Sequence, residues 1–299
     1  MSPTPSEPAA VDLAGLVKRA AMRVDRELRR TDKTLLVEGD LSGQPAVAKV
    51  ALDQDPFWLG KWRHEIDVYR AFATSPPQLR VPRLLYTDEK RVLVLEKLDG
   101  RLLDHERYPA QAVTDADLTA VLAALGGLTA WATGRRLLGP VFDYPDRIRR
   151  YYAAGYLADD DRDALTSLLA HRHPWQINHG DPLPSNLLLT SDGCVPLDWE
   201  FTGTFLPGFD LAMLHALLVN TPAAGTAIDR IVNREGITEP FVINLAMVLT
   251  RELRIHHGLL PGPLREARLP LIEFAWGRAR DRLHAVAARP ESSASLRRK

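Results

Sequence analysis

The chain carries the run His179-Gly180-Asp181-Pro182-Leu183-Pro184-Ser185-Asn186, which is followed by Pro196-Leu197-Asp198-Trp199-Glu200. The two prolines of the first run lack a backbone N–H and have a fixed φ, so they favour a rigid loop. Apolar residues at positions 175–178 and 187–189 indicate a short strand on each side of that loop. A turn signal at residues 190–193 and an apolar strand at residues 194–197 then predict a hairpin that ends at Asp198.

The spacing of the polar residues in this loop and hairpin indicates a chemistry. Asp181 precedes Asn186 by five positions, and Asp198 lies twelve positions beyond Asn186. Phosphoryl transfer from a nucleotide requires a carboxylate that accepts the proton of an attacking hydroxyl. It also requires an amide oxygen and a second carboxylate that hold magnesium. Either run alone is typical of an ordinary turn or strand end, and only their combination favours a catalytic site.

The same chemistry requires a cation on the nucleotide phosphates, and Lys49 is the candidate. It lies in the middle of the apolar strand at residues 45–52, in a chain that otherwise prefers arginine. The following helix, at residues 56–72, has Glu65 on its apolar face. We therefore expect a Lys49–Glu65 ion pair, because a buried lysine needs a carboxylate. The alternatives are a charge that protects an edge strand, and a glutamate that reaches solvent beside the apolar stripe.

Together these residues resemble the aminoglycoside phosphotransferase and choline kinase superfamily, which are small-molecule kinases with a protein-kinase-like fold. The resemblance extends from about residue 25 to about residue 285 and is most specific at the catalytic loop. It implies an α+β, bilobal fold. The small N-lobe would contain a five-stranded antiparallel sheet with one crossing helix, and the larger C-lobe would be mainly helical.

The resemblance also implies a role for each matching residue. Asp181 would be the catalytic base, with Mg²⁺ and either ATP or GTP as co-substrate. The other roles are magnesium binding by Asn186 and Asp198, phosphate contact by Lys49 oriented by Glu65, adenine contact by the backbone around Glu96, Lys97 and Leu98, and support of the catalytic loop by His179 and Asp210.

One segment departs from the pattern of the family. The loop expected to cover the phosphates, at residues 29–33, contains no glycine, although glycine-rich loops let backbone amides approach phosphates closely. Arg30 or Lys33 would have to compensate for that missing device.

Local patterns divide the chain into two lobes and two ends. Residues 1–10 and 289–299 are predicted to be disordered because they are polar and lack apolar periodicity. Residues 11–97 are expected to form the nucleotide-binding N-lobe. Residues 98–288 are expected to form the helical C-lobe with the catalytic and metal loops and the acceptor site. The nucleotide is expected to bind in the cleft between the lobes.

Periodicity and turn signals predict the individual elements. Beside the helix at residues 56–72, an N-terminal helix is expected at Val11–Arg23. The five predicted N-lobe strands are Val24–Arg29, Thr34–Glu38, Ala46–Leu52, Arg83–Tyr86 and Val92–Leu95. The predicted C-lobe helices are Asp115–Thr133, Asp146–Ala154, Asp160–Ala170, Phe209–Asn220, Ala224–Val232, Pro240–Arg254 and Leu269–Ala287.

Composition limits the function classes. The chain has 299 residues, 45% of them hydrophobic, which predicts a globular protein of one large or two modest domains. Its formal net charge of zero does not favour a nucleic-acid partner. The single cysteine, Cys194, excludes an intramolecular disulfide, and no segment is apolar enough for a signal peptide or a membrane span. We expect a cytoplasmic monomer or homodimer.

The acceptor is expected to be a small molecule with a hydroxyl group. An aminoglycoside or another antibiotic is favoured, with a role in resistance or self-protection. The alternatives are a metabolic acceptor such as choline, a sugar or an amino alcohol, and a nucleotide-binding pseudokinase. The acidic run at residues 159–163 would attract a polycation, but helix capping is the favoured interpretation of that run. Further candidates for contact with an amine or a ring are Glu200, Glu252, Glu273, Asp281, Trp199 and Trp276.

Overall fold

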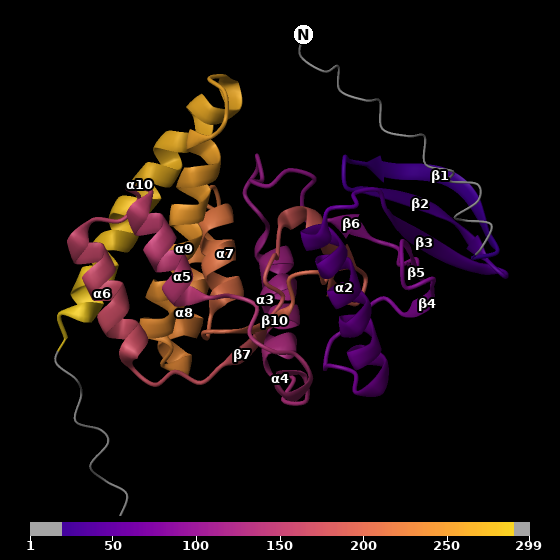
Figure 1. Ribbon diagram of the computed structural model, residues 1–299, viewed down its shortest axis with the longest axis horizontal. Helices are drawn as coiled ribbons and strands as arrows, with labels where there is room; N and C mark the ends of the chain where they lie inside the picture. The colour runs from indigo at the N-terminus through magenta and orange to yellow at the C-terminus, as the bar shows by residue number, and fades with distance from the viewer. Residues whose placement is uncertain (1–19, 290–299) are drawn as a thin grey trace, which may run out of the picture. The chain divides into compact units, whose positions relative to one another are not determined.

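A computed structural model describes residues 20–289 of the chain, which form two compact units (Figure 1). The first unit contains residues 20–76 and 81–99, and the second contains residues 77–80 and 100–289. The disorder predicted at residues 1–10 and 289–299 lies outside the described residues, except for Arg289, and so does the first part of the predicted N-terminal helix. The last two residues of that predicted helix, Met22 and Arg23, belong instead to a strand.

The first unit contains a five-stranded sheet in which every neighbouring pair is antiparallel, with the order β1-β2-β3-β5-β4. This confirms the predicted sheet, and the mixed α+β composition of the described residues confirms the predicted fold class. The predicted bounds of these strands differ from the observed ones by one to three residues at one or both ends. The strands are β1 (Met22–Arg30), β2 (Thr34–Leu41), β3 (Gln44–Ala51), β4 (Leu84–Thr87) and β5 (Val92–Glu96).

Alternation of side chains along these strands separates an apolar face from the face that carries Lys49. On the apolar face, aliphatic residues of β2, β3 and β5 pack into one core cluster. Side chains of a strand point alternately to opposite faces, so Lys49 lies on the other face. There it is aligned with Leu36 on β2 and Leu93 on β5. The apolar cluster includes Leu35, Val37, Ala46, Ala48, Val50, Val92 and Val94.

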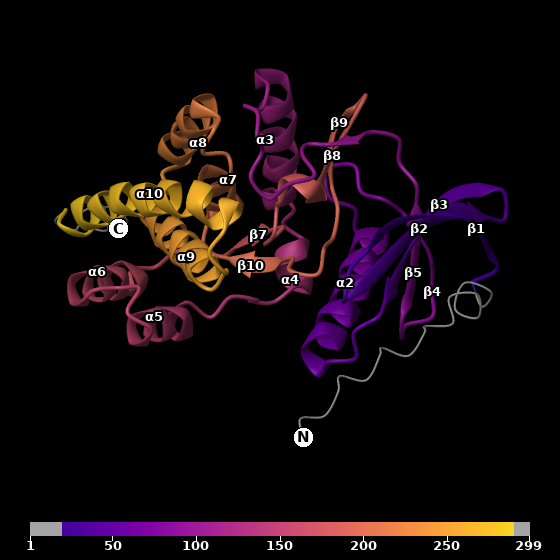
Figure 2. The ribbon, with the colours of Figure 1, turned by 90° about the horizontal axis from the view of Figure 1, so that it is seen from above.

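Helix α2 (Pro56–Thr74) packs beside this sheet (Figures 1 and 2). The Asp55 side chain caps it by accepting a hydrogen bond from the Phe57 backbone N–H, and Pro56 is suited to the first helical position. The helix ends two residues later than predicted. Its buried face includes Trp62, Glu65, Ile66, Val68, Tyr69, Ala71 and Phe72.

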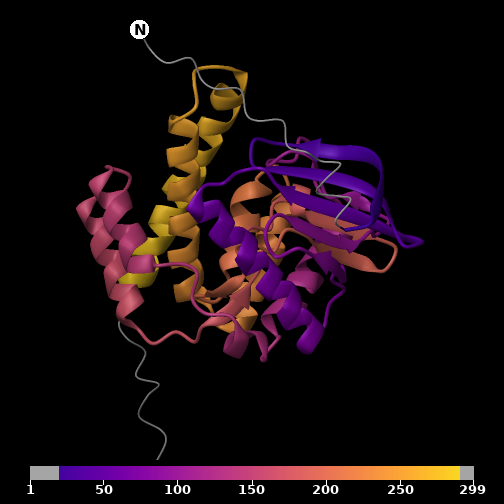
Figure 3. The same ribbon diagram turned by 45° about the vertical axis from the view of Figure 1, so that its right-hand side comes forward.

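The second unit is mainly helical, as predicted. The long helices α9 and α10 run side by side (Figure 3), and α9 is buried along most of its length. Helix α3 is shorter than predicted, and α10 begins six residues earlier than predicted and continues through Pro270. The helices are α3 (Asp115–Thr129), α4 (Gly134–Leu137), α5 (Tyr144–Ala153), α6 (Asp159–Ala170), α7 (Phe209–Leu217), α8 (Pro222–Glu235), α9 (Thr238–His257) and α10 (Pro263–Ala287).

Short strands of the second unit hold the loop that carries Asp181. The predicted hairpin is present as β8 (Leu187–Thr190) and β9 (Gly193–Pro196), and β6 (Arg101–Leu102) pairs with β8. Strand β7 (Gln176–Asn178) leads into the loop and pairs with β10 (Gly203–Phe205). Strands β6 and β10 were not predicted, because two or three residues are too few to show alternation. In residues 20–289, the helices lack the length and apolar character needed to cross a membrane.

Candidate active site

The loop between β7 and β8 has a backbone conformation at Gly180 that only glycine adopts readily. Gly180 has φ of +84°, a left-handed value that residues with a side chain rarely adopt. A Cβ atom at this position would lie 2.3 Å from the backbone oxygen of Phe201. Both the dihedral angle and the close approach therefore require glycine immediately before Asp181.

Asp210 holds the start of this loop from the first turn of α7. Its carboxylate accepts hydrogen bonds from the backbone N–H of His179 at 2.6 Å and of Gly180 at 2.9 Å. The backbone N–H of Asp210 donates in turn to Oδ1 of Asn178 at 3.2 Å. Burial raises the pKa of Asp210 to about 7, although the two N–H donors favour its charged form. These contacts hold the loop in place, and the supporting role suggested for Asp210 from the sequence stays a prediction.

His179 connects the loop to the segment that carries Asp198. Its Nε2 donates to the backbone oxygen of Leu197 at 2.9 Å, and its Nδ1 accepts from the backbone N–H of Asp181 at 3.3 Å. This pattern requires a neutral imidazole with the proton on Nε2. Burial lowers the pKa of His179 to about 4, although the nearby Asp198 raises it. His179 is therefore neutral near pH 7 and positions its neighbours.

Asn186 and Asp198 are brought together by the hairpin. Nδ2 of Asn186 donates to the backbone oxygen of Asp181 at 3.0 Å, which leaves Oδ1 as the acceptor atom of the amide. The backbone N–H of Leu197, next to Asp198, donates to the backbone oxygen of Asn186 at 2.8 Å. Asp198 has φ of +65°, a strained conformation for a residue other than glycine. Such strain is common where a side chain is held in place for function.

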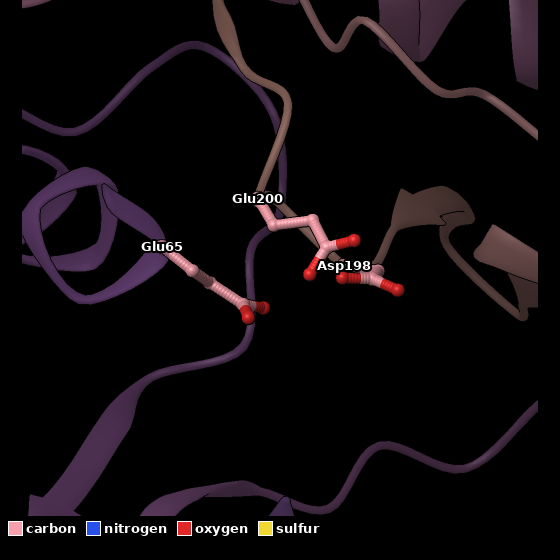
Figure 4. Close-up of side chains that lie close together, drawn as sticks. All are labelled: Glu65, Asp198 and Glu200. Carbon is pink, nitrogen blue, oxygen red and sulfur yellow. The ribbon is translucent and has the colours of Figure 1, made fainter. Parts of the chain in front are cut away.

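The carboxylate of Glu200 is a further oxygen donor that the sequence did not suggest as a metal ligand. Its oxygen and that of Asp198 lie within 4.8 Å of each other. Figure 4 shows both side chains on the segment after β9, and also Glu65, which belongs to α2 in the first unit. Hard oxygen atoms of this kind are what Mg²⁺ prefers, so Asp198, Glu200 and the Asn186 amide fit that ion. The sequence signal was the second acid, two positions after Asp198.

Asp181 lies among charges of both signs. Burial raises the pKa of its carboxyl group, the charges of Arg251 and Arg107 lower it, and those of Asp198 and Glu252 raise it again. The net effect is an increase, which moves the carboxylate toward the basicity that a proton acceptor needs near neutral pH. Neither arginine was suggested by the sequence.

Within the first unit, the predicted Lys49–Glu65 ion pair is present. Nζ of Lys49 lies 2.7 Å from Oε2 of Glu65, and the two residues are 8% and 1% exposed. The ring of Trp62 also lies near the ammonium group, with its centroid 5.8 Å from Nζ. The ion pair therefore holds the lysine side chain in one orientation.

The segment expected to contact adenine already uses two of its N–H groups within the first unit. The backbone N–H of Glu96 donates to Arg83 at 2.9 Å, and that of Lys97 donates to Pro45 at 3.1 Å. The Lys97 ammonium lies 3.2 Å from a Glu38 carboxylate oxygen. Direct contact with adenine would therefore have to come from Leu98 or from backbone carbonyl groups of this segment.

The glycine-free loop between β1 and β2 is a tight turn. Its two candidate cations both have partners in the first unit. Arg30 pairs with Glu27 at 2.9 Å, and Nζ of Lys33 lies 3.6 Å from the ring centroid of Trp58.

Several candidates for contact with an amine or a ring are buried or have other partners, and two are exposed. In the acidic run, Asp161 accepts from the backbone N–H of Ala158 and from Arg280, which is the capping arrangement favoured from the sequence. Glu252 is fully buried and accepts hydrogen bonds from Arg107 and Tyr108. Trp199 is also fully buried. Glu273 and Asp281 are exposed, and Trp276 packs against the core.

Comparison with known proteins shows similarity in sequence and in fold. The sequence profile of the phosphotransferase enzyme family matches residues 30–243. No curated protein matches the chain. The fold is similar to that of a thermostable mutant of aminoglycoside phosphotransferase APH(4)-Ia, with a TM-score of 0.58 and 15% identity over 92% of this chain and 99% of that one.

Two further solved structures are similar in fold. One is macrolide 2′-phosphotransferase MphH from Brachybacterium faecium, with a TM-score of 0.55 and 16% identity over 94% of this chain and 99% of that one. The other is a choline/ethanolamine kinase family protein from Mesorhizobium loti, with a TM-score of 0.61 and 16% identity over 93% of this chain and 97% of that one. Identities this low show a shared fold, and the predicted resemblance to these kinases is confirmed.

Proposed function

Because this chain belongs to the phosphotransferase enzyme family, we propose that it transfers the γ-phosphoryl group of a nucleoside triphosphate to a hydroxyl group of a small molecule. The observation that carries this proposal is the loop from His179 to Asn186. Its hydrogen bonds tie Asp181, Asn186 and Asp198 into one arrangement within the second unit. That set of groups is the one that phosphoryl transfer to an alcohol requires.

In the proposed reaction, Asp181 orients the acceptor hydroxyl and receives its proton. The hydroxyl oxygen forms a bond to the γ-phosphorus as the bond from that phosphorus to its bridging oxygen breaks. The electron pair of the broken bond leaves with the nucleoside diphosphate. The raised pKa of Asp181 is consistent with a carboxylate that accepts this proton.

Asn186 and Asp198 would hold Mg²⁺, and Glu200 is placed to assist them. The bound ion would supply charge neutralisation for the phosphate oxygens. Lys49 would contact the phosphates, and its ion pair with Glu65 would keep the ammonium group in position. The backbone N–H of Leu98 would donate a hydrogen bond to the adenine base. ATP is favoured over GTP because a structurally similar aminoglycoside phosphotransferase is known in complex with ADP and hygromycin B.

The acceptor class is open between an antibiotic and a metabolic alcohol. The similar folds include phosphotransferases named for aminoglycosides and macrolides, and a choline/ethanolamine kinase family protein. Among the acidic side chains suggested for an amine or a polycation, Glu252 and Asp161 are engaged with arginines of their own unit, and Glu273 and Asp281 are exposed on α10. The antibiotic prediction therefore depends on fold similarity alone.

A transfer screen tests the proposed function. The protein is incubated with Mg²⁺ and ATP or GTP and with a panel of aminoglycosides, macrolides, choline, sugars and hydroxy acids. Mass spectrometry then detects an acceptor that has gained one phosphoryl group. Asp181→Asn serves as the inactive control, because it keeps the shape of the side chain and removes the base.

The outcomes separate the alternatives. Transfer by the wild type and not by Asp181→Asn supports the proposal. Slow nucleotide hydrolysis that depends on Asp181, without transfer, indicates an intact catalytic centre and an acceptor outside the panel. Nucleotide binding with neither transfer nor Asp181-dependent hydrolysis supports the pseudokinase alternative and rejects the proposed function.

A further inference from the structure

A buried carboxylate organises two arginines near Asp181. Oε1 of Glu252 lies 2.6 Å from Nη2 of Arg107, and Oε2 accepts from Nε of Arg107 at 3.0 Å and from the hydroxyl of Tyr108 at 2.5 Å. Nε of Arg251 lies 3.4 Å from Oε1 of the same carboxylate. Arg107 and Arg251, called the arginine pair below, are 30% and 22% exposed at their side chains, whereas that of Glu252 is 1% exposed.

Backbone contacts place Arg107 beside the catalytic loop. The backbone N–H of Leu103 donates to Leu187 at 2.8 Å, and that of Asp104 donates to Pro184 at 3.4 Å. Pro184 lies within the loop that runs from His179 to Asn186. Arg107 follows Asp104 by three residues, so its position is restricted to the neighbourhood of that loop.

Arg251 is connected to the same loop through α7. Its Nη2 donates to the sulfur of Met213 at 2.8 Å, and Met213 lies one turn after Asp210, which holds the loop. A thioether is only a weak acceptor. Within residues 20–289, Nε of Arg251 is buried and has no hydrogen-bond partner. The hydrogen bonds of the Arg251 guanidinium group within the protein are therefore weak or incomplete. The forked arrangement of its donors suits an oxyanion.

The electrostatics of the cluster are positive toward Asp181. Burial raises the pKa of Glu252, but the hydrogen bond and charge of Arg107 outweigh it and lower that pKa to about 2. Glu252 is therefore charged near pH 7 and neutralises one of the two arginines. Within the cluster of Glu252 and the arginine pair, one positive charge remains in excess, and both arginines act on the carboxylate of Asp181. A buried position strengthens this field, because water screens it less.

Resting on the proposed function, we propose that the arginine pair binds an acidic group of the acceptor, so that the substrate is a hydroxy acid bearing a carboxylate or a phosphate. The half-buried arginines are exposed enough to be reached, and Glu252 holds them in advance of binding. A polycationic acceptor would instead place like charges beside one another. An aminoglycoside would require an acidic surface at this place, whereas the arginine pair makes the surface basic.

Four three-carbon probes test this proposal because they share two hydroxyl groups and differ in the third substituent. They are glycerate, glycerol 3-phosphate, glycerol and 3-aminopropane-1,2-diol. Their dissociation constants are measured by ligand-observed NMR on the full chain with Mg²⁺ and a non-hydrolysable ATP analogue. We expect at least one acidic probe to bind about 10-fold or more tightly than glycerol, and the amine to bind no better than glycerol. The two acidic probes distinguish a carboxylate site from a phosphate site.

Variants assign this preference to the arginine pair. Arg251→Gln leaves Glu252 with Arg107 and Tyr108 and is expected to fold. The double variant Arg107→Gln, Glu252→Gln removes one charge of each sign and avoids an unpaired buried carboxylate. Each is expected to reduce the preference for an acidic probe by about 10-fold. Arg254→Gln, an exposed position on the same helix, is the matched control and should change nothing.

Three results would overturn the proposal. The first is binding of the amine as tight as that of the acidic probes, or no preference for an acid over glycerol. The second is an acid preference that survives in both variants, which would place the anion elsewhere. The third is loss of affinity for the ATP analogue in the variants with an unchanged acid preference, which would make the pair a nucleotide contact. Asp181-dependent hydrolysis of ATP, measured in separate samples without the analogue, shows whether the proposed function stands.

Discussion

The carboxylate of Asp210 accepts the backbone N–H of His179 at 2.6 Å, across 31 positions of the chain. The imidazole of His179 in turn hydrogen-bonds to the backbone oxygen of Leu197, next to Asp198, so three segments of the second unit are joined at one buried histidine. The geometry of the candidate active site depends on this connection, and the following predictions test it.

Replacement of Asp210 by asparagine should loosen the catalytic loop. Asparagine keeps one acceptor oxygen, but its side-chain NH₂ group would face the backbone N–H of either His179 or Gly180, and both groups are donors. We expect a loss of about 1–3 kcal/mol in the free energy of unfolding, measured with urea, together with a lower rate of nucleotide hydrolysis. Asp192→Asn, at the exposed end of the β8–β9 hairpin, is the control. Equal stability of the two variants would contradict the supporting role of Asp210.

The Lys49–Glu65 pair should show coupling in a double-mutant cycle. Lys49→Met removes the cation 2.7 Å from a carboxylate that is 1% exposed, and we expect a loss of about 3 kcal/mol in the free energy of unfolding. The double variant Lys49→Met, Glu65→Leu should lose less, because the carboxylate is removed with its partner. Urea unfolding of the four proteins measures the coupling energy. Additive losses would show that the ion pair is unimportant for stability.

Folding stability should depend on pH through His179. The pKa of His179 is about 4 in the folded protein, below its ordinary value of 6.5. The unfolded chain therefore binds a proton at a higher pH than the folded protein does, and stability is lost as pH falls from 6.5 toward 4. We expect a loss from this group of at most about 3 kcal/mol. The free energies of unfolding of wild type and His179→Gln, plotted against pH between pH 7 and pH 4, should converge. A constant difference between the two proteins would contradict the prediction.

Substitutions of Asp198 should distinguish the effect of backbone strain on stability from the effect of the carboxylate on metal binding. Asparagine tolerates the left-handed φ of +65° found here, so Asp198→Asn should change the free energy of unfolding by less than about 1 kcal/mol. Asp198→Val should cost about 1–3 kcal/mol, because a β-branched residue is strained at this angle. Both should require more Mg²⁺ for nucleotide hydrolysis than the wild type. An unchanged Mg²⁺ titration in Asp198→Asn would contradict the proposed role of this carboxylate in metal binding.

Much of the fold and part of the site could be predicted because the relevant signals are local. The helical period places Glu65 on the buried face of its helix, and strand alternation places Lys49 toward that helix. The turn at residues 190–193 predicts the hairpin that brings Asp198 back toward Asn186. The assigned roles of these residues stay predictions until activity is measured. Strands β6 and β10 escaped prediction because each is too short to show a period.

The sequence by itself determined the loop from His179 to Asn186, the hairpin and the buried lysine, because each depends on residues close together in the chain. Only the tertiary structure decided the environment of the acceptor. Glu252, suggested from the sequence as a partner for an amine, is bound by Arg107 from 145 positions away. No periodicity encodes which side chains meet over that distance, because the meeting depends on how α9 packs against the segment after β6. For this reason the charge beside Asp181 became visible only in the folded chain.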